Sequence, residues 1–142
     1  MMDRVRDDLF FGDIYDAVDH DSYRRNGIDA AVKLCGVRPV PGYPEDVDVY
    51  DHGMPDSRDN TREEFSEAVN RVQDLIRNGE TVFVHCGAGQ SRSVCVSAAV
   101  HALFDDEDFE YGLNRLRDLR NVNPHPQLVE NGRRTVDGDI FL

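Results

Sequence analysis

Short apolar runs alternate along the chain with longer segments in which apolar residues recur at helical spacing. The short runs predict four strands, at residues 9–15 (with a glycine kink), 28–35, 47–50 and 81–84. Between the second and third runs, residues 36–44 contain three prolines and two glycines, which predicts a loop. Residues 51–60 are polar and predict a second loop.

The clearest helix begins at Thr61, because Thr61 and Glu64 form a capping box ahead of an apolar stripe that runs from Phe65 to Ile76. Asn78-Gly79 ends it. A shorter helix, capped by Asp19 or Asp21, ends at Asn26-Gly27. Three more helices are predicted: residues 92–104, a segment that begins near Phe109 and is broken by Pro124 and Pro126, and residues 127–136.

Strands separated by helices predict the α/β class, with a central mixed and mostly parallel sheet and helices on both faces. The length of 142 residues fits one domain, which we expect to span residues 1–142. The sequence contains no repeat, long linker or low-complexity segment.

The nine residues from His85 to Ser93 contain the candidate chemistry. They lie between an apolar strand and a small-residue helix, and such a loop directs backbone N–H groups toward an anion at a helix N-terminus. These N–H groups also stabilise a thiolate, so Cys86 is a candidate nucleophile near neutral pH. Arg92, six positions later, can return to the same anion with a planar, bidentate guanidinium. The combination suits a phosphate monoester.

The pattern His85-Cys86-x5-Arg92-Ser93 resembles the signature of cysteine-dependent protein tyrosine phosphatases, and Gly89 and Ser91 resemble the dual-specificity branch. Residues 9–13 are similar to the family's opening strand and residues 123–128 to its closing turn. The resemblance implies a phosphatase fold of the dual-specificity type. It also implies hydrolysis of phosphotyrosine, with phosphoserine and phosphothreonine as further substrates, through a cysteinyl-phosphate intermediate.

The resemblance also implies roles for individual residues. Cys86 attacks phosphorus, Arg92 binds the phosphate and the transition-state oxygens, and Ser93 donates a hydrogen bond to the thiolate. His85 supports the loop, either structurally, by orienting it through hydrogen bonds, or by a direct electrostatic effect on the site. The phosphate-binding positions are Gly87, Ala88, Gly89, Gln90, Ser91 and Arg92.

The leaving oxygen needs a proton, and family members supply it from an aspartate about thirty residues before the cysteine. Asp56 is our first candidate, because Met54-Pro55-Asp56 resembles the family's proline-preceded acid after a strand. Asp59 and then Asp51 are the alternatives. In a chain so rich in aspartate, a single loop aspartate is usually a solvated residue. The choice of Asp56 as the general acid therefore depends on its place in the sequence and not on its residue type.

Charge limits the partners. The net charge is −12, which argues against nucleic acid or an anionic membrane as a partner. Asp far outnumbers Glu, and of the 16 basic residues only Lys33 is a lysine, a composition that resembles proteins of salt-accumulating haloarchaea. We expect a phosphorylated protein as substrate, no cofactor or metal, and a monomer. The N-terminal residues have no signal-peptide pattern, so we expect a cytoplasmic location.

Other interpretations of the same loop stay open. The same chemistry on a phosphoinositide, nucleotide or RNA 5′ phosphate is disfavoured, because the x5 segment has no lysine or arginine. An inactive phosphate-binding module is disfavoured by the intact Cys86 and Arg92, and a sulfurtransferase by His85 and Ser93. Cys35 and Cys95 form no Cys-x-x-Cys pair and are expected to pack in the core, although Cys95 could act as a resolving thiol.

Overall fold

The structure is a computed structural model that describes residues 1–36 and 42–138. The described residues form one five-stranded sheet in the order β1-β2-β5-β3-β4. All neighbouring strands are parallel except β1, which pairs antiparallel with β2. The strands are β1 Asp3–Arg6, β2 Leu9–Gly12, β3 Ala30–Lys33, β4 Asp48–Asp51 and β5 Val82–His85. The predicted mixed, mostly parallel α/β sheet is therefore confirmed, with β5 at its centre.

Local signals start and end most of the helices. The Asp19 side chain caps the first helix by accepting from Ser22 N, and Gly27 ends it in the left-handed conformation at φ 64°. The Thr61–Glu64 capping box is complete, with both reciprocal hydrogen bonds present. The helices are a 3₁₀ turn at Asp16–Val18, α1 His20–Asn26, α2 Arg62–Arg77, α3 Arg92–Phe104, α4 Phe109–Leu119 and α5 Pro126–Asp137.

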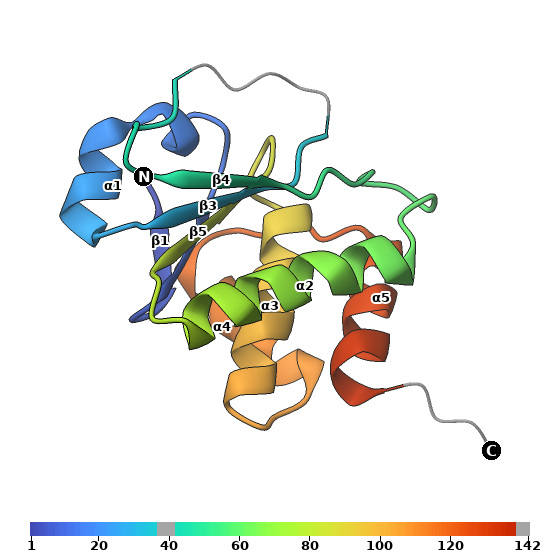
Figure 1. Cartoon of the computed structure of the whole chain (residues 1–142). Coiled ribbons are helices and arrows are strands. Elements are labelled where there is room, and N and C mark those ends of the chain that lie inside the picture. The colour runs from blue at the N-terminus through green and yellow to red at the C-terminus, as the bar shows by residue number, and fades with distance from the viewer. Residues whose placement is uncertain (37–41, 139–142) are drawn as a thin grey trace.

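The strands alternate their side chains between two cores. Leu9, Phe11 and Val84 face a large core under α2–α5, whereas Phe10 and Phe83 face a smaller one under α1. Figure 1 shows α1 on one side of the sheet and the other four helices on the opposite side. The helix α3 lies in the middle of its layer against α2, α4 and α5, which explains why nearly all of its residues are buried.

The structure corrects several predicted bounds. The opening strand is β1, which was not predicted because only Val5 of its four residues is buried. Strand β2 ends at Gly12 rather than at residue 15, because Asp13 and Asp16 bond each other's backbone N–H groups at 2.9 and 3.0 Å and turn the chain. Strand β3 is shorter than predicted, β4 lies one residue later and α5 begins one residue earlier, at Pro126.

Part of the predicted 36–44 loop, residues 37–41, lies outside the described residues. Among the residues that are described, no helix combines the length and the apolar character needed to cross a bilayer.

Candidate active site

The loop from Cys86 to Ser91 joins the end of the central strand β5 to the first residue of α3. It contains the predicted phosphate-binding positions and is called the phosphate loop below. Two backbone contacts hold its carbonyls outward: Ile14 N donates to Gly87 O at 3.1 Å, and Asn123 N donates to Gln90 O at 3.0 Å. With these carbonyls engaged outside, the loop's N–H groups are left for its interior. This backbone arrangement, at the carboxyl end of the sheet, is the one that the predicted anion cradle requires.

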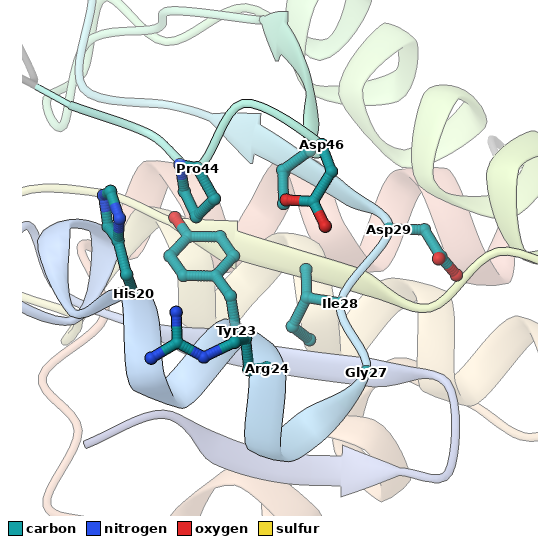
Figure 2. Close-up of a pocket in the computed structure, with 9 residues that line it drawn as sticks. His20, Tyr23, Arg24, Gly27, Ile28, Asp29, Pro44 and Asp46 are labelled. Atoms are coloured by element: carbon teal, nitrogen blue, oxygen red, sulfur yellow. The ribbon is translucent and has the colours of Figure 1, made fainter.

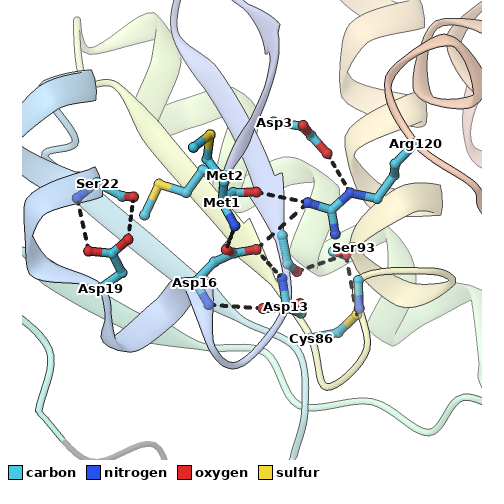
Figure 3. Close-up of polar contacts among 12 residues, drawn as sticks. Met1, Met2, Asp3, Asp13, Asp16, Asp19, Ser22, Cys86, Ser93 and Arg120 are labelled. Carbon is cyan, nitrogen blue, oxygen red and sulfur yellow. Dashed lines mark hydrogen bonds and ion pairs between the residues drawn. The ribbon is translucent and has the colours of Figure 1, made fainter.

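Cys86 lies at the floor of this loop and is 2% exposed. Gly89 N donates to Cys86 Sγ at 3.3 Å. Figure 3 shows Ser93 beside Cys86, with Ser93 Oγ 3.2 Å from the same sulfur. Ser93 Oγ also lies 3.4 Å from the carbonyl oxygen of Gly12. The sulfur thus has two polar neighbours at the floor of the loop, the Gly89 N–H group and the Ser93 hydroxyl.

The Arg92 side chain reaches over the carboxyl edge of the sheet. Its Nη1 donates to Met54 O at 3.1 Å and to Leu34 O at 3.3 Å, which fixes the plane of the guanidinium. Its Nε is buried and has no hydrogen-bond partner within residues 1–36 and 42–138. A buried donor without a partner is costly, so this N–H group lacks the acceptor that buried donors usually have.

The three candidate aspartates have different environments. Asp56 Oδ1 accepts a hydrogen bond from Ser91 Oγ at 2.5 Å and so contacts the phosphate loop. Asp51 Oδ1 instead accepts from Gly53 N at 2.9 Å, within its own turn. Asp59 is exposed, and its backbone N–H donates to Ser57 Oγ at 3.2 Å. Of the three side chains, only that of Asp56 is joined to the phosphate loop among the described residues.

Buried asparagines hold the segment that carries Asp56. Asn60 Nδ2 donates to Pro55 O at 2.9 Å, next to Asp56. Asn131, on α5, donates from its Nδ2 to Asn60 Oδ1 at 2.8 Å and to Asn60 O at 3.0 Å. Both asparagines are almost fully buried, at 3% and 1% exposure, so their hydrogen bonds fix the loop against α5.

His85 is fully buried and stacks on Phe83, with ring centroids 5.5 Å apart. Its Nε2 lies 2.6 Å from the hydroxyl of Tyr43. Burial lowers the pKa of His85 from 6.5 to about 4, although the backbone of Cys86 partly opposes that drop. The imidazole is therefore neutral at pH 7, which fits a supporting role rather than that of a charged group.

The loop also has support that sequence reasoning missed. Arg120 forms an ion pair with Asp3 and lies 3.7 Å from Asp16 Oδ2 (Figure 3). Its guanidinium carbon also lies over the Phe11 ring, 4.9 Å from the ring centroid. A Cβ at Gly89, whose φ is 68°, would lie 2.7 Å from Arg120 Nη1. Glycine at this position thus allows the loop to pack against an arginine. No local signal around residue 120 indicated this contact.

Cys35 and Cys95 are buried free thiols. Burial raises the pKa of both, which keeps them protonated and unreactive. The structure agrees with their expected packing role. Within the described part of the chain, no cluster of three or more His, Cys, Asp or Glu side chains could hold a metal ion.

A cavity of about 440 Å³ lies away from the loop, between α1 and residues 44–47 (Figure 2). Its lining mixes Arg24 and His20 with Asp29 and Asp46, and the Tyr23 hydroxyl beside them already donates to Ala17 O at 2.8 Å. Because basic and acidic side chains both line the cavity and the Tyr23 hydroxyl already has a hydrogen-bond partner, the lining favours no particular class of ligand.

The geometry can be compared with that of known proteins. The sequence profile of the dual specificity phosphatase catalytic domain matches residues 9–123, a span that includes the whole phosphate loop. The chain belongs to the dual-specificity phosphatase family. Zebrafish (Danio rerio) dual specificity protein phosphatase 22-A is 35% identical over 100 residues, which are 69% of this chain and 47% of that protein. The chain therefore matches about half the length of this curated relative.

Solved structures of other dual-specificity phosphatases share the fold. Human DUSP28 superposes with a TM-score of 0.86 at 18% identity, over 96% of this chain and 93% of that one. DUSP15 superposes with a TM-score of 0.80 at 24% identity, over 94% and 85% of the two chains. These likenesses confirm the predicted phosphatase-type fold.

Proposed function

We propose that the chain is a cysteine-dependent phosphatase that hydrolyses phosphotyrosine, and also phosphoserine and phosphothreonine, in phosphorylated proteins. The observation that carries the proposal is the environment of Cys86. Its sulfur receives Gly89 N–H and lies beside Ser93 Oγ, at the floor of a loop whose Gly87 and Gln90 carbonyls are held outside. This arrangement matches what a thiolate nucleophile beneath a phosphate requires.

In the first step the Cys86 thiolate attacks phosphorus in line with the leaving oxygen. The S–P bond forms as the P–O bond breaks, and Asp56 gives its proton to the departing oxygen. Arg92 and the loop N–H groups hold the three equatorial oxygens, on which charge is spread during the transfer.

In the second step water attacks the cysteinyl phosphate. Asp56, now ionised, takes the proton from the water, and the S–P bond breaks to release phosphate and the thiolate. Ser93 Oγ, 3.2 Å from the sulfur, donates a hydrogen bond to the departing thiolate. The cycle returns both groups to their starting protonation states and needs no metal.

Hydrolysis of p-nitrophenyl phosphate, measured in molar KCl with EDTA, tests the mechanism. Wild type should turn over and Cys86→Ser should be inactive. Asp56→Asn should lower kcat on phenyl phosphate by ~10²–10⁴, the usual contribution of general acid catalysis, and should lower it less on p-nitrophenyl phosphate, whose leaving group is better. Asp59→Asn and Asp51→Asn are matched controls that should retain activity. If folded wild-type protein is inactive, or if Cys86→Ser turns over, the proposed mechanism is wrong.

Protein substrates follow from the absence of lysine and arginine at positions 87–91 and from the acidic chain, neither of which favours a polyanionic substrate. We also propose that residues 1–142 act as one catalytic domain and as a monomer. A reducing, cytoplasmic compartment would keep the thiolate nucleophile from forming a disulfide.

A haloarchaeal host would explain the acidic, lysine-poor composition. Phosphopeptides carrying each of the three phosphorylated residues would rank the substrates.

A further inference from the structure

Ser91 is a predicted phosphate-binding position, but its side chain makes its hydrogen bonds to other segments of the chain. It is 5% exposed and lies between the phosphate loop, the Asp56 loop and the turn before α5. Its Oγ accepts a hydrogen bond from His125 N at 2.9 Å and donates one to Asp56 Oδ1 at 2.5 Å. One hydroxyl thus joins three segments that are far apart in the sequence.

The His125 contact sets the direction of the Ser91 hydrogen. A hydroxyl has one hydrogen and two lone pairs, and the His125 N–H occupies a lone pair. The single hydrogen is then directed to Asp56 Oδ1, at a separation typical of O–H donors that bond a carboxylate. Oδ2 of Asp56 stays available for the proton that the leaving oxygen needs.

His125 is itself held in place. Its neighbour Asn123 donates from its backbone to Gln90 O, and His125 Nδ1 accepts from Gln127 N at 3.0 Å, which caps α5. Ser91 therefore accepts its hydrogen bond from a residue that is itself held in place at the N-terminus of α5. Asp56, by contrast, is exposed, so without Ser91 its side chain would be free to leave the loop.

We propose that Ser91 is a positioning residue for the general acid: through the His125 backbone it holds the Asp56 carboxyl over the phosphate loop. The proposal rests on the proposed function. It predicts that loss of the hydroxyl weakens proton donation while nucleophilic attack by Cys86 is retained. The loss should then be large for poor leaving groups, which need the proton, and small for good ones.

The experiment compares kcat/KM of Ser91→Ala and wild type on phenyl phosphate and on p-nitrophenyl phosphate. Phenolate is the poorer leaving group, so we expect a loss of about 10-fold on phenyl phosphate and at most about 3-fold on p-nitrophenyl phosphate. Ser97→Ala is the matched control. Ser97, on α3, is a buried serine like Ser91, but its hydroxyl has no hydrogen-bond partner within the described chain, so both rates should stay unchanged.

A double-mutant cycle gives the second readout. In an Asp56→Asn background, Ser91→Ala should cause no further loss, because the group that it positions is already gone. An equal loss on both substrates, or a full loss that persists with Asp56→Asn, would show that Ser91 only stabilises the loop and would overturn the proposal. If Ser91→Ala does not fold, Ser91→Cys, a weaker donor, replaces it with the same expected pattern.

Failure of the two proposals can be told apart. Inactive wild type or active Cys86→Ser contradicts the phosphatase mechanism itself. Active wild type, inactive Cys86→Ser and a uniform loss in Ser91→Ala contradict only the role of Ser91.

Discussion

Acidification should destabilise this protein through the buried imidazole of His85. The imidazole is fully buried, stacked on Phe83 and hydrogen-bonded to Tyr43. Burial lowers its pKa from 6.5 to about 4 in the folded chain, whereas the unfolded chain keeps the ordinary value.

The direction of the effect follows from proton uptake. Above pH 6.5 the ring is neutral in both states, so folding pays no penalty there. Between 6.5 and about 4 the unfolded chain binds a proton that the folded chain does not, so stability falls with pH. At ~1.4 kcal/mol for each pKa unit, the loss is about 2 kcal/mol at roughly pH 5 and approaches ~3 kcal/mol below pH 4.

Urea unfolding in molar KCl, at about pH 7.5 and about pH 5, would measure this loss. The comparison is between Cys86→Ser and the double variant Cys86→Ser/His85→Gln, so that the thiol does not titrate in either protein. Burial also lowers the pKa of His52 and His101, but both proteins keep those groups and the contribution cancels. The variant with His85 should lose about 2 kcal/mol more on acidification. Equal losses would show that His85 is not buried as a neutral ring.

Two further predictions concern stability away from the phosphate loop. A Cβ at Gly112 would meet the carbonyl of Ala98 on α3, so Gly112→Ala should lower the free energy of unfolding by ~1–3 kcal/mol despite alanine's better helix propensity; an unchanged urea midpoint would contradict this. Thr61→Ala removes the acceptor for Glu64 N and should cost ~1 kcal/mol in the same assay, with kcat unchanged; a loss below a few tenths would mean that the cap does not stabilise α2.

The sequence by itself determined the elements whose signals are local. The Thr61–Glu64 box, an aspartate cap at Asp19 or Asp21 and the Gly27 stop each act within a few residues along the chain, so no distant contact was needed to recognise them; the structure places the cap at Asp19. The strand, loop and helix around Cys86 are equally local, since one glycine-bearing segment between two apolar runs defines them. The resemblance to the phosphatase family came from this same segment.

Tertiary structure decided which distant groups meet at that loop. In the sequence, Asp56 is ranked ahead of Asp59 and Asp51 only by a resemblance to the family's proline-preceded acid. The packing of α5 on the Asn60 segment is what brings Asp56 to Ser91. The β1 strand was also undetectable, because a four-residue edge strand with one buried side chain has no apolar pattern of its own. The residue pattern predicts backbone conformation over a few neighbouring positions. The hydrogen-bond partners of a carboxyl, an imidazole or a hydroxyl depend instead on how separate elements pack.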